Sequence, residues 1–145
     1  MLRNYIVLVL ATTTKDFVDT TKDFVHTHGV KPTQSELAIL DVLWRMGPCT
    51  VRQVHDVVGG GYTTTLKLMQ IMAEKGLVVR DERERAHVYS TRLLKEATQG
   101  MMVRDLMDRA FGGSAAQLVM RALAEGQASN DELDIIRQML KEYER

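Results

Sequence analysis

Between residues 31 and 61 the hydrophobic positions recur with the spacing of two helices. The first helix is predicted to begin at a capping box, Thr33-Gln34-Ser35-Glu36, and to end at Gly47-Pro48. A second capping box, Thr50-Val51-Arg52-Gln53, opens a shorter helix that ends at Gly59-Gly60-Gly61. The residues expected to face inward are Leu37, Leu40, Leu43 and Trp44 in the first helix and Val54, Val57 and Val58 in the second.

Residues 61–92 combine a longer amphipathic helix, a glycine and a hairpin, and they are the most informative part of the chain. The helix is predicted to start near Tyr62 and to end at Gly76, and its buried stripe consists of Thr65, Leu68, Met69 and Met72. Two short strands follow, on either side of a charged turn at residues 81–85. Two short helices, a turn and a third helix form a helix-turn-helix, and the hairpin adds a wing. The pattern therefore predicts a winged helix-turn-helix domain over residues 31–92, mainly α with a small β-hairpin.

Residues 93–145 have helical spacing throughout, with an interruption at Gly112-Gly113 and a third capping box at residues 129–132. Three thin amphipathic helices cannot bury their apolar faces by themselves, so a second copy of the chain is the expected partner. We therefore predict a helical dimerisation region over residues 93–145, with contacts through Met102, Leu106, Phe111, Leu118, Leu133, Ile136 and Leu140.

Residues 1–30 form an extension of unknown role. Their apolar run at residues 5–11 resembles a weak signal peptide and fits a short strand equally well. A seven-residue segment at 13–19 is then nearly repeated at 20–26, which is too little for a repeat fold. We interpret this segment as a variable or artefactual addition to the domain that follows.

Composition narrows the function less than the pattern does. The formal net charge is zero, which disfavours nucleic acid mildly, but residues 31–92 hold nine Lys and Arg against seven Asp and Glu. The single cysteine, Cys49, excludes an internal disulfide and suits a reducing compartment, so a cytoplasmic protein is expected. No apolar run approaches the length of a membrane span.

The polar face of the helix that starts near Tyr62 carries residue types that read DNA bases. Gln70 can bond adenine, Lys67 can reach guanine or a phosphate, and Thr63 can contact either. Thr64 and Leu66 flank this face, and an exposed leucine could touch a thymine methyl group. The competing interpretation is an ordinary solvated helix face.

The turn between the two predicted strands places Arg83 and Arg85 at the tip of the wing, where phosphate or minor-groove contacts are expected. Three acidic residues share this turn, so a merely solvated hairpin is the alternative interpretation.

Motifs for catalysis are missing from the sequence. It contains no phosphate-binding glycine loop, no His-Glu-x-x-His, no paired cysteines and no Gly-x-Ser-x-Gly. We therefore predict no enzyme, no catalytic residue, no cofactor and no metal site.

Several of these segments together resemble the penicillinase-repressor family of the BlaI/MecI type. They are residues 32–40, Leu43-Trp44, residues 62–67, residues 74–77, residues 87–89, Phe111-Gly112-Gly113-Ser114 and Leu118-Val119. The resemblance covers about residues 31–143 and implies a dimeric winged-helix repressor of palindromic operators, with the C-terminal helices holding the dimer.

The resemblance also sets limits on how repression is released. A membrane sensor protease triggers cleavage of an Asn–Phe bond in characterised family members, whereas Arg121-Ala122 stands at that position here. An upstream sensor or protease is therefore a doubtful partner. Copper-responsive relatives carry a cysteine-rich C-terminal site, and this chain has no cysteine after Cys49.

The sequence leaves three hypotheses. The first is a homodimeric repressor that reads a palindromic, double-stranded DNA operator with the helix starting near Tyr62. The second is a dimeric winged-helix module that binds proteins and not DNA. The third is a redox or metal sensor that acts through Cys49 or the histidines.

Overall fold

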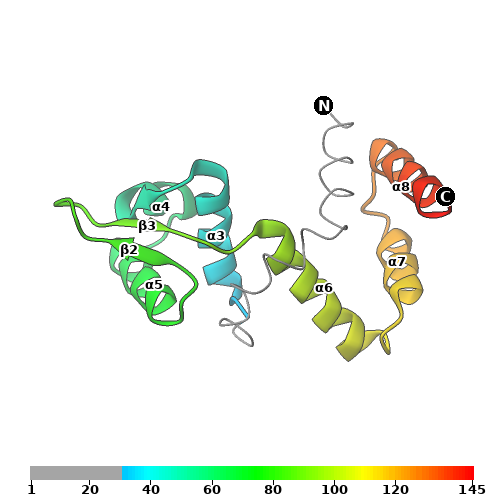
Figure 1. Cartoon of the computed structure of the whole chain (residues 1–145), viewed down its shortest axis with the longest axis horizontal. Coiled ribbons are helices and arrows are strands. Elements are labelled where there is room, and N and C mark those ends of the chain that lie inside the picture. Colours follow the sequence, from blue (N-terminus) through cyan, green and yellow to red (C-terminus); the bar gives the residue numbers. More distant parts are fainter. Residues whose placement is uncertain (1–30) are drawn as a thin grey trace. The chain divides into compact units, whose positions relative to one another are not determined.

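The computed structural model describes residues 31–145, so the interpretations of residues 1–30 lie outside the described part. The described residues belong to two units, 31–103 and 104–145, and one helix spans the boundary between them (Figure 1). The first unit contains α3 (Gln34–Met46), β1 (Cys49–Thr50), α4 (Val51–Val58), α5 (Tyr62–Glu74), β2 (Val79–Asp81), β3 (Val88–Ser90) and the start of α6 (Lys95–Ala110). The second contains the rest of α6, α7 (Ala115–Ala124) and α8 (Asn130–Tyr143).

All three predicted capping boxes are formed, which explains where α3, α4 and α8 begin. At α3, the Glu36 amide donates to Thr33 Oγ1 at 3.3 Å and the Thr33 amide donates to Glu36 Oε2 at 2.9 Å. Two orphan amides of the first helical turn are thereby satisfied. Between α4 and α5, Gly59 and Gly60 both have positive φ values, 73° and 79°, that glycine adopts without strain.

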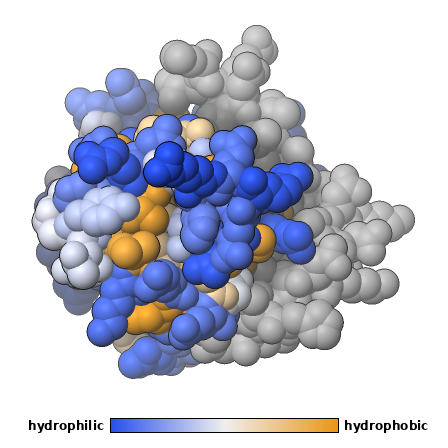
Figure 2. Space-filling view, turned by 90° about the vertical axis from the view of Figure 1, so that its left-hand side faces the viewer, coloured by the Kyte–Doolittle hydropathy of each residue, from blue (hydrophilic) through white to orange (hydrophobic). Residues whose placement is uncertain are grey.

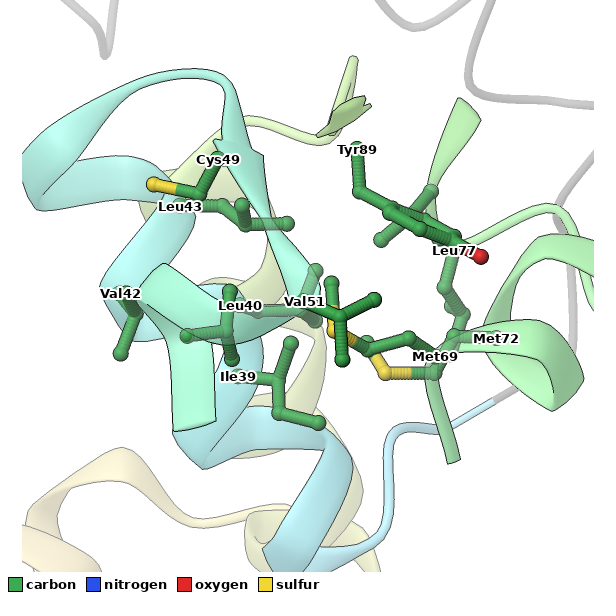
Figure 3. Close-up of a cluster of buried hydrophobic side chains, with 12 residues drawn as sticks. Ile39, Leu40, Val42, Leu43, Cys49, Val51, Met69, Met72, Leu77 and Tyr89 are labelled. Atoms are coloured by element: carbon green, nitrogen blue, oxygen red, sulfur yellow. The ribbon is translucent and has the colours of Figure 1, made fainter. Parts of the chain in front are cut away.

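The core of the first unit lies where α3, α4 and α5 meet the sheet (Figure 3). Leu40, Val54, Met69 and Met72 are completely buried, and each contributes about 1.5–3 kcal/mol relative to an exposed position. Three of the four residues of the predicted stripe of α5 are buried, Thr65, Met69 and Met72, and the fourth, Leu68, is half-buried and packs against the core. Helix α3 packs against both α4 and α5, and its buried face is therefore wider than predicted and includes Ile39 and Val42.

One prediction about the core is wrong. Val57 and Val58 do not face inward: their side chains are 48% and 37% exposed. Only Val51 and Val54 of α4 are buried, since the helix ends at Val58 and its last turn leads out of the core to the exposed glycines.

A three-stranded antiparallel sheet replaces the predicted two-stranded hairpin. Its order is β1-β3-β2, with Cys49 opposite Tyr89 and Thr50 opposite Val88. Strand β1 therefore fastens the start of α4 to the wing. Cys49 belongs to this strand and is buried.

Helix α5 ends in a Schellman motif at the glycine that was predicted to stop it. The Leu77 amide donates to the Met72 carbonyl at 2.9 Å, and the Gly76 amide donates to the Ala73 carbonyl at 3.1 Å. Gly76 has a φ of 78°, which this motif requires and which a side chain would disfavour.

An ion pair connects the first turn of α3 to the end of α5. Lys75 Nζ donates to Glu36 Oε1 at 2.6 Å, and the Glu36 side chain is only 1% exposed. Burial by itself raises the pKa of Glu36, but hydrogen bonds from Lys75 and Thr33, together with the Lys75 charge, lower it below its ordinary value. One carboxylate thus caps α3 and anchors α5.

The start of α6 is part of the first unit, because Ala97 and Thr98 are buried and the Trp44 indole N–H donates to the Leu93 carbonyl at 2.9 Å. By contrast, no residue of α7 or α8 is buried. Within residues 31–145, no helix combines the length and apolarity needed to cross a bilayer. The observed fold confirms the prediction of a mainly helical winged helix-turn-helix domain followed by C-terminal helices.

Candidate nucleic-acid interface

The exposed face of α5 presents most of the predicted reading residues to solvent. Thr63, Thr64, Lys67 and Gln70 are exposed, while Thr65, Met69 and Met72 anchor the opposite face in the core. Leu66 is an exception, because it is half-buried and packs against the core. The expectation of an exposed Leu66 is therefore wrong, although one edge of this side chain lines the groove described next.

A groove of about 450 Å³ separates α5 from the wing and from the start of α4. Three arginines line it, Arg52 from α4, Arg80 from β2 and Arg85 from the wing loop, and none of its eleven lining residues is acidic. Hydrophilic side chains cover most of the wing end of the molecule, and a narrow apolar strip runs between them (Figure 2). The groove thus adds positive charge next to the polar face of α5.

Arg52 and Arg80 were not among the predicted DNA-binding residues. Arg52 reaches the groove because the pairing of β1 with β3 brings the start of α4 to the wing, and a two-residue strand leaves no recognisable sequence pattern. Its position in the first turn of a capped helix, where anions are favoured, was the available signal. The Arg52 guanidinium lies 5.9 Å from the centre of the Tyr62 ring, and His55 meets the same ring edge-on at 5.7 Å.

Arg80 is held in place by two neighbours. It lies directly opposite Tyr89 in the sheet and hydrogen-bonds to the Tyr89 side chain, and it also forms an ion pair with Glu82. Both contacts raise the pKa of Arg80 above its ordinary value, and the contact with Tyr89 has the larger effect. The sequence signal that could have found Arg80 is the alternation of side chains along the hairpin, because directly opposed side chains lie on the same face of the sheet.

The two predicted arginines of the wing differ in their surroundings. The Arg83 Nε donates to both carboxylate oxygens of Asp81, at 3.0 and 2.9 Å, and its amide also donates to Asp81 Oδ1 at 3.0 Å. These hydrogen bonds hold the pKa of Asp81 at about 2. Arg85 forms no ion pair with any residue between 31 and 145 and lines the groove. Arg83 therefore closes the turn locally, whereas Arg85 is available to a ligand.

Beside this groove lies a second recess, of about 550 Å³, with a different charge. Gln70 and Arg80 line both spaces, but the recess also contains Glu74 and Glu82. The positive surface therefore ends near Gln70, one turn before the end of α5.

Cys49 does not have the environment of a sensor thiol. Its side chain is 2% exposed, its thiol lies 3.2 Å from the Gly47 carbonyl, and burial raises its pKa. A protonated, buried thiol is a poor nucleophile and metal ligand. Within the described part of the chain, no three His, Cys, Asp or Glu residues lie close enough together to hold a metal.

The residues predicted to form the dimer all keep some exposure in a single chain. Leu106 and Leu140 are 49% and 60% exposed, and the others are half-buried: Met102, Phe111, Leu118, Leu133 and Ile136. Each of the three C-terminal helices thus retains exposed apolar surface.

Comparisons with known proteins identify relatives. Residues 32–142 match the family described as penicillinase repressor. Two curated proteins named transcriptional regulator BlaI, from the Mycobacterium tuberculosis strains CDC 1551 / Oshkosh and ATCC 25618 / H37Rv, are 35% identical over 115 residues, which cover 75% of this chain and 82% of each relative. Among solved structures, a probable transcriptional regulator from Pseudomonas aeruginosa has a TM-score of 0.42 and 18% identity, with 88% of this chain and 92% of that chain covered. A MarR protein from Peptoclostridium difficile has a TM-score of 0.42 and 10% identity, with 95% and 85% covered.

Proposed function

Because this chain belongs to the penicillinase repressor family, we propose that it binds a palindromic operator as a homodimer and reads each half-site with α5. Membership makes it a DNA-binding transcriptional repressor with a winged helix and not an enzyme. The pairing of subunits, the operator symmetry and the reading helix are our proposal.

The observation that carries the proposal is the position of the three-arginine groove beside the polar face of α5, whose reading residues carry no charge apart from Lys67. A helix in the major groove needs short polar side chains toward the bases and cations toward the flanking phosphates. Thr63, Thr64, Lys67 and Gln70 supply the first set, with the edge of Leu66 beside them. Arg52, Arg80 and Arg85 supply the second.

Within the wing, we assign phosphate contact to Arg85 and a structural role to Arg83. The Arg83 guanidinium is already satisfied by Asp81, whereas Arg85 has no acidic partner within residues 31–145. Of the two arginines predicted to contact DNA from the wing tip, we therefore retain Arg85.

The dimer is proposed to form through residues 93–145. Their apolar side chains, described above as half-buried or exposed, keep that exposure among residues 31–145, and a twofold pairing would bury them. A symmetric dimer places two copies of α5 about one helical turn of DNA apart, or a multiple of it, which suits a palindrome. The repressor would act in the cytoplasm, and Arg121-Ala122 in place of the family's Asn–Phe pair disfavours release by that cleavage.

A direct test measures the binding of the purified chain to labelled duplexes that tile the region upstream of its own gene. Replacing Lys67 or Gln70 by Ala should weaken binding to the tightest duplex by about 1–3 kcal/mol each. Lys141→Ala, in α8, removes the same charge as Lys67→Ala outside the winged-helix unit and is the matched control. If Lys67→Ala and Gln70→Ala both bind like Lys141→Ala, α5 does not read the operator in this way.

The zero net charge and the acidic recess favour one second candidate, a dimeric winged-helix module that binds a protein. Operator binding predicts an affinity that falls with salt at a log–log slope of roughly −0.9 per neutralised phosphate. A chain that sediments as a dimer but binds none of the duplexes at low salt would support the protein-binding module instead.

A further inference from the structure

Glu82 stands out in the wing because it neutralises one of the three arginines that line the groove. It pairs with Arg80, and the two side chains are 54% and 37% exposed. Arg80 lines both the groove and the acidic recess, as Gln70 does. A DNA backbone that follows the groove would meet Arg80 together with its carboxylate.

Arg80 can engage DNA without losing its support from the sheet. The Tyr89 side chain is 1% exposed and holds the guanidinium from the core side. A guanidinium has five N–H donors in a planar fork, so the contact with Tyr89 leaves donors for a phosphate. The contact with Glu82 is different, because a carboxylate and a phosphate compete for the same charge.

From this geometry we infer that Glu82 is a restraint on DNA affinity: it holds Arg80 in an internal ion pair that a DNA phosphate must displace. The inference rests on the proposed function and assigns Arg80 as a phosphate-binding residue of the same interface. An exposed ion pair is only weakly stabilising, so DNA can break it, but the affinity is lower than three open arginines would give.

The wing contains its own matched control. Glu84 carries the same charge as Glu82 and lies in the same loop. It forms no ion pair within residues 31–145 and lines neither the groove nor the recess. Any general effect of removing a negative charge from the wing should therefore appear in both Glu82→Gln and Glu84→Gln, whereas release of Arg80 appears only in the first.

The experiment titrates the full-length chain and its variants against the tightest of the upstream duplexes over a series of salt concentrations. We expect Glu82→Gln to tighten binding about fivefold while the log–log salt slope stays the same, because Arg80 neutralises one phosphate in both proteins once its ion pair is displaced. Glu84→Gln should change the affinity by less than about twofold, since exposed charges are screened.

A double-mutant cycle locates the effect on Arg80. In an Arg80→Gln background, Glu82→Gln should lose its advantage over Glu84→Gln, because no cation is left to release. Equal affinities of Glu82→Gln and Glu84→Gln, or an advantage that persists without Arg80, would overturn the inference and leave DNA binding itself intact. A parent chain that binds no duplex would remove both the inference and the proposed function.

Discussion

Replacing Lys75 by Met should destabilise the winged-helix unit, because it leaves the Glu36 carboxylate buried without its counter-charge. Removing one partner of a fully buried ion pair costs about 3–5 kcal/mol. Here the Lys75 side chain is 36% exposed, so water already screens part of the attraction, and the Thr33 amide still donates to Glu36. We therefore expect the free energy of unfolding to fall by about 1–3 kcal/mol at neutral pH.

The loss should depend on pH with a defined sign. The folded state lowers the pKa of Glu36 below the ordinary value of 4.5. The stabilisation is therefore complete above pH 4.5 and disappears as the pH falls through the lower, folded-state pKa. The difference in stability between the parent and Lys75→Met should be largest near neutrality and should shrink in acid.

Urea denaturation followed by tryptophan fluorescence measures this difference, because Trp44 is the single tryptophan and is anchored to Leu93 within the first unit. Lys67→Met, on the exposed face of the same helix, controls for the loss of a lysine. A second control, Glu36→Gln, keeps a residue that suits the capping box, so Lys75→Met should cost much less in that background. Equal losses for Lys75→Met and Lys67→Met, or a loss that does not change with pH, would refute the reasoning.

Three further predictions follow from single features. Gly60→Ala forces a side chain into a φ of 79° at the turn before α5. The free energy of unfolding, measured by urea denaturation, should therefore fall by about 1–3 kcal/mol. An unchanged denaturation curve would mean that the turn relaxes without cost. The Cys49 thiol should react with Ellman's reagent only as fast as the unit unfolds, because it is buried with a raised pKa; rapid labelling of the native chain at neutral pH would revive the sensor hypothesis. Asp81→Asn frees Arg83, so DNA affinity should rise at neutral pH. In the parent, the Asp81–Arg83 contact should persist as the pH falls from 7 to below 3.8, the ordinary pKa of an aspartate, and should be lost only near the Asp81 pKa of about 2. The chemical shift of the Asp81 carboxyl carbon, followed by NMR, measures this loss.

Helix positions and fold class could be predicted because their signals are local. Each capping box lies within four residues, and the buried stripe of α5 repeats at every turn. Val57 and Val58 have the same local pattern as a buried turn, but their burial depends on whether another element reaches the end of α4. That information lies outside the segment itself.

The interface was predictable on α5 and less so in the groove. The polar face of a helix follows from its own spacing, so the exposure of Lys67 and Gln70 on α5 was predictable. Arg52 depends on a strand of two residues that pairs with a partner about forty positions later, and neither the strand nor its register can be read from so short a segment. The distinction between Arg83 and Arg85 depends on which rotamer reaches Asp81, which charge counting does not reveal.

The short strand β1 also affects how much conformational freedom remains when DNA arrives. It joins the start of α4 to the wing through the backbone, so the walls that carry Arg52 and Arg85 are already arranged in the free protein. Loops that become ordered only on contact reduce affinity through lost entropy, and a pre-ordered wall avoids most of that loss. This chain has no excess of positive charge, so its electrostatic attraction to DNA is modest. A smaller loss of conformational entropy on binding offsets part of that deficit in affinity.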